Sequence, residues 1–111
     1  MASYLGFQTW KMFHCFDESN DTNRQTLIFA RDIGEAREIA DTSEVMSKVP
    51  EEHRHFTYLK KQMWLYQYSK GYACCVDDVP KCKSCEQFVT SELTNGFCEH
   101  CNRELQNGFI G

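Results

Sequence analysis

The sequence lacks any long hydrophobic run, since no stretch approaches the ~20 apolar residues that a membrane-spanning helix requires. It begins Met1-Ala2-Ser3-Tyr4, with neither a basic nor a long apolar segment, so we expect no signal peptide and a cytoplasmic location. An excess of positive charge is also missing, because the 111 residues carry a net charge of −4. A protein dominated by phosphate contacts needs clustered cations, so this balance disfavours a general nucleic-acid binder.

A coherent set of catalytic residues is missing as well. His14-Cys15 matches the start of the H-C-x5-R signature of cysteine-dependent phosphatases, but position 21 is Asp21 and no glycine-rich phosphate loop follows. Neighbouring residues of a strand point to opposite faces, which also disfavours a Cys–His nucleophile. We therefore expect no catalytic residues and a protein that is not an enzyme.

What the sequence does contain is enough apolar material for a packed core, with 41% hydrophobic and 14% aromatic residues. It also contains seven cysteines. An odd number without a secretion signal favours a reducing compartment and metal binding over a disulfide framework.

Four of these cysteines have the spacing of a metal site. Cys82 and Cys85 form one C-x-x-C pair, and Cys98 and Cys101 form a second pair twelve residues later. Two such pairs can supply the four corners of a Zn²⁺ tetrahedron, and the interval has room for two short strands joined at Asn95-Gly96. Four thiolates leave no position for water, so we expect structural rather than catalytic zinc. An iron centre would use the same four ligands, so the sequence does not distinguish zinc from iron.

Two further cysteines, Cys74 and Cys75, precede the first pair by a few residues. The simplest interpretation is that they are small buried side chains. Substitution of one of them for a metal ligand stays open at this point.

The N-terminal half predicts a β-hairpin followed by a helix. Residues 4–16, most clearly 9–16, and residues 25–30 are rich in aromatic or β-branched residues and predict two strands, which a polar turn-forming run separates. Both faces of the first strand carry apolar groups, so we expect both faces to be covered. Asp32, with Glu35 three residues on, predicts a capped helix that ends near residues 41–43.

Residues 51–70 predict a second helix. Pro50-Glu51-Glu52 suits a first helical turn, because proline needs no N–H there, and Phe56, Leu59, Met63 and Tyr66 recur at helical spacing. A competing alternation of aromatic residues from position 64 to 68 favours a strand there instead. A short strand or connector at 71–76 and a turn of helix after the last cysteine complete the prediction.

The stretch from 53 to 70 is basic, with four cations and no acid, whereas residues 17–52 carry ten acids and four bases. On a helix, Arg54, Tyr58, Lys60 and Lys61 would form a face for nucleic acid or for an acidic partner. The simpler interpretation is a solvated helix face.

The run Ile28-Phe29-Ala30-Arg31-Asp32-Ile33-Gly34-Glu35-Ala36-Arg37-Glu38-Ile39-Ala40 resembles short phage accessory proteins. In these proteins a strand feeds "A-R" into a small Ala-rich helix, and a C-terminal zinc-ribbon-like C-x-x-C module sometimes follows. The resemblance covers residues 25–41 and 82–101. It implies a viral regulator or inhibitor of host machinery that acts in the host cytoplasm.

Together these patterns predict an α+β protein, with an antiparallel β-hairpin packed on one or two helices in residues 1–76 and a four-cysteine zinc ribbon in residues 77–111. We expect a non-enzymatic interaction protein that binds a protein partner, with Phe88, Leu93 and Phe97 displayed on the ribbon. The alternative is a nucleic-acid-binding zinc ribbon that uses the basic helix face. Fifteen aromatic residues also leave room for an exposed apolar patch and a homodimer.

Overall fold

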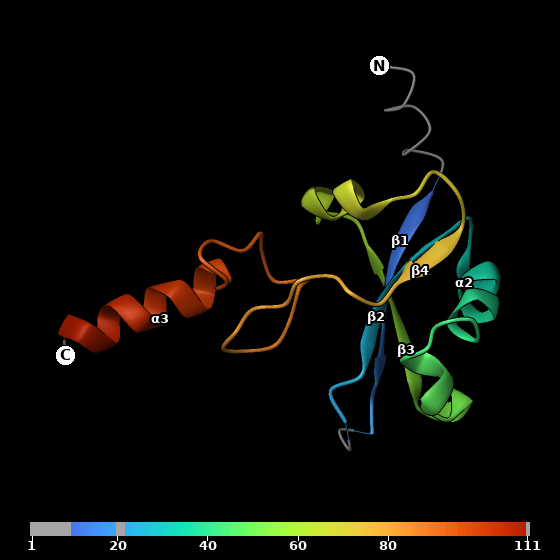
Figure 1. Cartoon of the computed structure of the whole chain (residues 1–111), viewed down its shortest axis with the longest axis horizontal. Helices are drawn as coiled ribbons and strands as arrows, with labels where there is room; N and C mark the ends of the chain where they lie inside the picture. The colour runs from blue at the N-terminus through green and yellow to red at the C-terminus, as the bar shows by residue number, and fades with distance from the viewer. Residues whose placement is uncertain (1–9, 20–21, 111) are drawn as a thin grey trace. The chain divides into compact units, whose positions relative to one another are not determined.

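The computed structural model describes residues 10–19 and 22–110, with the side chains of residues 105–110 excepted (Figure 1). The chain divides into two compact units, Met1–Asp78 and Val79–Gly111. No helix in the described part of the chain is long and apolar enough to cross a membrane.

The first unit is built on a four-stranded antiparallel sheet with strand order β3-β1-β2-β4 (Figure 1). Its strands are β1 (Lys11–Asp17), β2 (Gln25–Ala30), β3 (Arg54–Leu59) and β4 (Cys74–Val76). The predicted hairpin is confirmed as β1 and β2, which pair in the register Phe13↔Ile28. Strand β3 pairs with β1 and strand β4 pairs with β2, so β1 and β2 are the central strands of the sheet.

The predicted capped helix is confirmed as α2 (Ile33–Ala40). The Asp32 carboxylate accepts a hydrogen bond of 2.8 Å from the backbone N–H of Glu35, and the Glu35 carboxylate accepts one of 2.8 Å from the backbone N–H of Arg31. These bonds satisfy backbone donors that lack a partner within the helix. The helix packs on β2 through small residues that are fully buried, Ala36 and Ala40.

Both faces of the sheet are covered, as the apolar residues on both sides of the first strand predicted. On one face, Phe13, Cys15 and Ile28 form a core cluster with α2 and the short 3-10 helix η1 (Met46–Lys48). Buried on the other face are further residues of the same two central strands: Met12, His14, Leu27 and Phe29. The Phe29 ring lies 6.2 Å from that of Tyr66, which belongs to the 3-10 helix η3 (Met63–Tyr68).

The predicted helix over residues 51–70 is wrong. The segment is a 3-10 turn η2 (Glu51–His53), then strand β3, then η3. Phe56 pairs with Cys15 on β1 and packs into the core cluster, whereas Leu59 faces the opposite side of the sheet. The apolar residues that recur at helical spacing therefore belong to two separate elements, β3 and η3. Pairing with β1 determines the extended conformation of β3.

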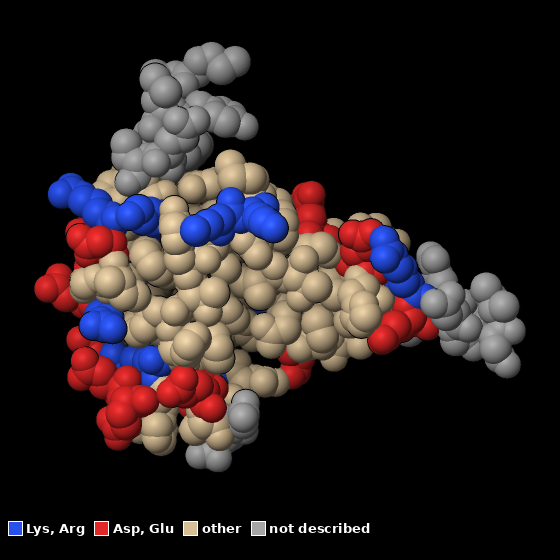
Figure 2. Space-filling view, turned by 180° about the vertical axis from the view of Figure 1, so that it is seen from behind, with Lys and Arg blue, Asp and Glu red and all other residues tan. Residues whose placement is uncertain are grey.

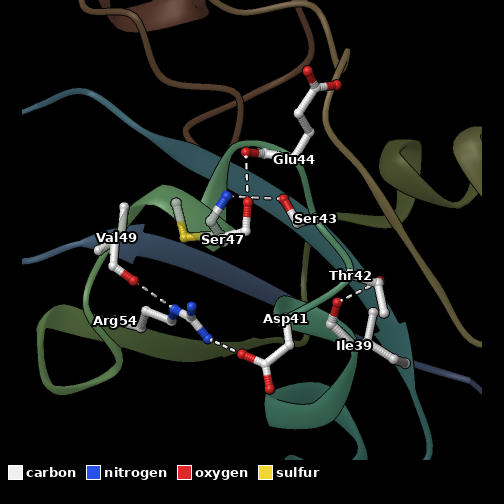
Figure 3. A network of polar contacts seen from close by, with 9 residues as sticks. Ile39, Asp41, Thr42, Ser43, Glu44, Ser47, Val49 and Arg54 are labelled. Carbon is white, nitrogen blue, oxygen red and sulfur yellow. Dashed lines mark hydrogen bonds and ion pairs between the residues drawn. The ribbon is translucent and has the colours of Figure 1, made fainter.

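The connection between α2 and β3 is held by polar contacts (Figure 3). Arg54 donates from Nε to the Val49 carbonyl at 3.0 Å and from Nη1 to the Asp41 carboxylate at 2.6 Å. Ser47 donates its backbone N–H to the Ser43 carbonyl at 2.8 Å and its hydroxyl to the Glu44 carbonyl at 3.0 Å (Figure 3). These hydrogen bonds give the connection between α2 and β3 a defined conformation.

The second unit has little regular structure before its helix, α3 (Glu99–Ile110). Strand pairing in its described residues is limited to one isolated bridge between Thr94 and Phe97. The structure therefore shows a four-cysteine module with one tight turn, not the two paired strands expected between the C-x-x-C motifs. The helix is longer than the single turn predicted after the last cysteine.

Candidate metal centre

The first pair of cysteines lies on a tight backbone turn. The backbone N–H of Cys82 donates to the Gln87 carbonyl at 2.9 Å, and that of Glu86 donates to the Cys82 carbonyl at 2.9 Å. Glu86 closes the turn with a positive φ of 60°, and the backbone N–H of Ser84 points at the Cys82 sulfur at 3.4 Å. This geometry brings the Cys82 and Cys85 side chains to the same side of the turn, as a C-x-x-C metal knuckle requires.

The predicted Asn95-Gly96 turn is confirmed. Thr94 and Phe97 exchange backbone hydrogen bonds of 2.8 and 3.1 Å across it, and Asn95 and Gly96 both have positive φ, 57° and 88°. Two consecutive left-handed residues are typical of the mirror-image turns that favour Asn-Gly. The Gly96 carbonyl also accepts a 2.8 Å bond from the backbone N–H of Lys83, which ties the turn to the first knuckle.

The second pair lies at the start of α3. The backbone N–H of Asn102 donates to the Cys98 carbonyl at 2.9 Å, and that of Glu99 donates to the Ser91 hydroxyl at 2.7 Å. One helical turn therefore holds Cys98 and Cys101 close together, and the Ser91 hydroxyl satisfies one of the free donors at the helix start.

The four sulfur atoms converge, and all lie within 4.8 Å of one another. The Sγ atoms of Cys85 and Cys98 are 3.8 Å apart. Zinc–sulfur bonds of ~2.3 Å in a tetrahedron place neighbouring sulfurs about 3.8 Å apart, so the cluster fits such an ion. Cys82, Cys98 and Cys101 are buried and Cys85 is exposed.

The protonation of the cluster also suits a cation. Burial raises the pKa of Cys82, but backbone hydrogen bonds from Cys85, Cys98 and Ser84 outweigh it and bring the pKa down to about 6. Hydrogen bonding to Cys98, together with burial, raises the pKa of Cys101 to about 12. The Cys82 thiol therefore ionises readily whereas the Cys101 thiol keeps its proton, and a divalent cation would favour the loss of that proton.

The structure brings together the four predicted ligands and places the other cysteines elsewhere. Cys74 and Cys75 lie in β4, and the Cys75 sulfur packs near the Thr42 hydroxyl at 3.7 Å. Cys15 is buried in the sheet core, where burial raises the pKa of its thiol to about 12. His14 points to the other face and bonds the Gln25 side chain at 2.9 Å. These two residues are therefore not arranged as a nucleophile and its base.

The predicted basic face does not exist as a helix face. The Arg54 side chain is 8% exposed and is held by Asp41 and Val49, so it belongs to the fold. Tyr58, on β3, is 45% exposed, and Lys60 and Lys61 follow the end of that strand. On the face that Figure 2 displays, several Lys and Arg side chains lie in a row along the upper edge, and others lie among acidic side chains.

One residue of this region was missed by the sequence analysis. The ammonium of Lys11, on β1, lies 5.7 Å from the centre of the Tyr58 ring, and that of Lys60 lies 5.5 Å from it. Lys11 and Tyr58 are far apart in the sequence, and only the register of β1 with β3, which pairs Phe13 with Tyr58, brings them together. No local pattern signals this contact.

Of the three apolar residues expected on the surface of the metal module, one is buried and two are half-buried. Phe88 is 2% exposed. Leu93 and Phe97 are partly buried and pack against the cysteine cluster. With the cysteines they form a small core, as a module of 33 residues needs.

No family model, curated protein or solved structure matches the chain. The resemblance of residues 28–40 to phage accessory proteins is therefore not supported by an identified relative. The fold and the four-thiol cluster are the basis on which a function can be assigned.

Proposed function

We propose that this chain is a non-enzymatic interaction protein, stabilised by one structural zinc ion, that binds another protein. The observation that carries the proposal is the convergence of four cysteine sulfurs within 4.8 Å. Four thiolates complete a tetrahedral sphere and leave no open position, which is typical of structural zinc. An iron centre uses the same four thiolates, so metal analysis must distinguish the two ions.

A binding role is supported by what surrounds the cluster. Phe88 is buried and Leu93 and Phe97 pack against the four cysteines, so a metal held there would stabilise the fold of the module. Charge is uneven along the chain, with a net −6 over residues 17–52 and a net +4 over residues 53–70. Charge separation of this kind favours recognition of a complementary surface. The resemblance of residues 28–40 suggests a phage regulator or inhibitor of host machinery as the biological setting.

The alternative is a nucleic-acid-binding protein. It is favoured by Tyr58, a half-exposed aromatic ring flanked by Lys11 and Lys60, because such a ring can stack on a base. It is disfavoured by the net charge of −4 and by the commitment of Arg54 to Asp41.

Two measurements test the proposal. Metal analysis of the purified chain should give one zinc per molecule, retained through gel filtration. Affinity capture from host extract should then recover a protein partner in a nuclease-resistant manner, and the Cys98→Ser/Cys101→Ser variant is the control for dependence on the metal module. Capture of nucleic acid alone, with a steep dependence on salt, would contradict the proposal.

A further inference from the structure

The strand β3 forms one edge of the sheet. In the strand order β3-β1-β2-β4 it pairs only with β1 among the described residues, and it is six residues long. The opposite edge, β4, has only three residues. An edge strand presents backbone N–H and C=O groups that another chain can pair with. Of the two edges, β3 is the one long enough to receive a further strand.

The register of β1 with β3 shows which backbone groups of β3 face outward. Asp17 donates its backbone N–H to Arg24 on the β2 side, and Glu18 donates to His53 on the β3 side. Antiparallel pairing repeats every two residues, so His55, Thr57 and Leu59 bond to β1. The N–H and C=O groups of Phe56 and Tyr58 therefore point away from the sheet. The Arg54 N–H is already bonded to the Glu51 carbonyl.

The charges beside this edge favour an acidic occupant. Lys11 and Lys60 both lie within 5.7 Å of the centre of the half-exposed Tyr58 ring. Continuing the register one step beyond Met12↔Leu59 places these two lysines opposite each other, a like-charge pair that an anion would relieve. Within the described residues, no ion pair involves Lys11, Lys60 or Lys61.

A second copy of the chain is a poor match for the same edge. Residues 53–61 contain three cations, two histidines and no acid, so pairing β3 with another β3 would bring cations beside cations. Lysines near an edge strand are a common protection against such self-pairing.

We infer that the outward edge of β3 receives an extended segment of a protein partner, and that an acidic side chain of this segment lies against Lys11, Tyr58 and Lys60. The pairing is β-strand addition, in which main-chain hydrogen bonds give affinity and side-chain contacts give specificity. The inference rests on the proposed function, since it names the surface through which the chain would bind its protein partner.

A matched pair of variants tests the backbone part. Tyr58→Pro removes one outward N–H without removing a ladder bond to β1, because the Tyr58 N–H does not point to β1. Tyr58→Thr removes the same ring but keeps the backbone N–H, and threonine is a good strand former. The probe is a displayed library of random peptides about twelve residues long, selected on the zinc-loaded full chain.

The expected result is enrichment of extended peptides that contain Asp or Glu. Tyr58→Pro should bind them at least about tenfold more weakly than Tyr58→Thr, because a backbone bond is lost and the proline ring blocks the edge. Lys60→Glu, which leaves the backbone unchanged, should abolish the preference for acidic over basic peptides. This charge variant keeps the test decisive if Tyr58→Pro fails to fold, which its amide spectrum would reveal.

The inference is overturned if no peptide is enriched, if the enriched peptides are basic, or if Tyr58→Pro and Tyr58→Thr bind them equally. It is also overturned if the free chain forms a dimer that Tyr58→Pro dissociates, because the occupant would then be a second copy. If both Tyr58 variants still capture a host protein, the proposed function is supported and only the docking on the β3 edge is overturned. Failure of the proposed function would instead appear as the absence of any captured protein.

Discussion

The Ser43 hydroxyl donates a 2.6 Å hydrogen bond to the carboxylate of Asp77, 34 residues further along the chain. The same carboxylate accepts a 2.6 Å bond from the Thr26 hydroxyl on β2 and a 3.2 Å bond from the Glu44 backbone N–H. Ser43 and Thr26 are buried. Asp77 therefore fastens the segment after β4 to the sheet and to the loop that follows α2.

We predict that Asp77→Ala destabilises the first unit by about 1–3 kcal/mol, because the buried Ser43 hydroxyl loses its acceptor and the Thr26 hydroxyl keeps only the Val76 carbonyl at 3.1 Å. Asp77→Asn, which keeps one carbonyl acceptor, should cost less. Asp78, the exposed next residue, gives a matched control, and Asp78→Ala should change the free energy of unfolding by less than about 0.5 kcal/mol. Urea unfolding followed by fluorescence measures all three. Equal effects at positions 77 and 78 would contradict this role of Asp77.

Arg54 should behave as a structural residue. Arg54→Ala should destabilise the fold by about 1–3 kcal/mol, because the Val49 carbonyl and the packing of the buried stem lose their partner. Asp41 is 69% exposed, so the ion pair itself is worth little and Asp41→Asn should cost about 0.5 kcal/mol or less. Thermal unfolding of both variants measures the difference. A loss of partner binding by Arg54→Ala without a loss of stability would show that Arg54 is a contact residue after all.

The parts of the fold that sequence predicts are those determined by neighbouring residues. The hairpin follows from two strand-forming runs around a polar loop, and α2 follows from Asp32 and Glu35, whose side chains make the expected capping contacts. The Asn95-Gly96 turn and the four-cysteine cluster also follow from local spacing. In each case the residues that determine the structure lie close together in the sequence.

The parts that sequence does not predict depend on distant partners. Residues 54–59 have a mixed pattern, and pairing with β1, some 40 residues earlier, makes them a strand. The same pairing brings Lys11 to Tyr58. Phe88 was expected at the surface because its spacing suggested a ribbon, but a module this small must bury its few large apolar side chains.

Gly96 should be more sensitive to substitution than Gly71. Both glycines have positive φ, 88° and 82°, so alanine at either position is strained by about 1 kcal/mol. A Cβ at Gly96 would lie 2.7 Å from the far end of the exposed Lys83 side chain, which can move aside at little cost, and a Cβ at Gly71 meets nothing within 4 Å. The difference between the two positions is that Gly96 belongs to the turn whose carbonyl accepts a bond from the Lys83 backbone N–H of the first knuckle, whereas Gly71 lies in the first unit. We therefore expect Gly96→Ala to weaken zinc retention against a competing chelator and Gly71→Ala to leave it unchanged.

The double variant Lys83→Ala/Gly96→Ala separates the two causes. It removes the contact with the Lys83 side chain and keeps the strain of the positive φ. If the double variant recovers zinc retention only in part, the loss that persists comes from the strained backbone conformation. No difference between the two glycine variants would contradict the link between the turn and the metal centre.

Asp17 should contribute to stability in a pH-dependent manner. Hydrogen bonds from the Ser19 and Thr22 side chains, at 2.5 and 2.8 Å, hold the pKa of this carboxyl below its ordinary value of 3.8. The folded state then binds the proton less tightly than the unfolded state, so the contribution is complete above pH 3.8. It is lost as the pH falls through the lower pKa of the folded state. Unfolding measured from pH 6 down to acid should show a smaller loss for Asp17→Asn than for the wild-type chain.

Removal of the metal should unfold the second unit and spare the first. The second unit has a small core built around the four thiols, whereas the sheet of the first unit has its own buried core on both faces. We expect a strong chelator to abolish the dispersed amide signals of residues 79–104 while those of the sheet keep their positions. Cys98→Ser should reproduce this result, and Cys74→Ser, outside the cluster, should not.

Binding of zinc should also release protons. The pKa of Cys101 is raised to about 12 and that of Cys85 is raised by burial, so both thiols are largely protonated at neutral pH in the metal-free chain. Each proton that zinc displaces makes the affinity rise about tenfold per pH unit. Competition with a chelator at pH 6, 7 and 8 measures the slope, which should correspond to at least two protons. A slope near zero would mean that zinc displaces no protons, so that either the thiols are already ionised in the metal-free chain or they do not all bind the ion as thiolates. A spectrum of the cobalt-substituted chain distinguishes the two, because four thiolate ligands give a characteristic tetrahedral signature.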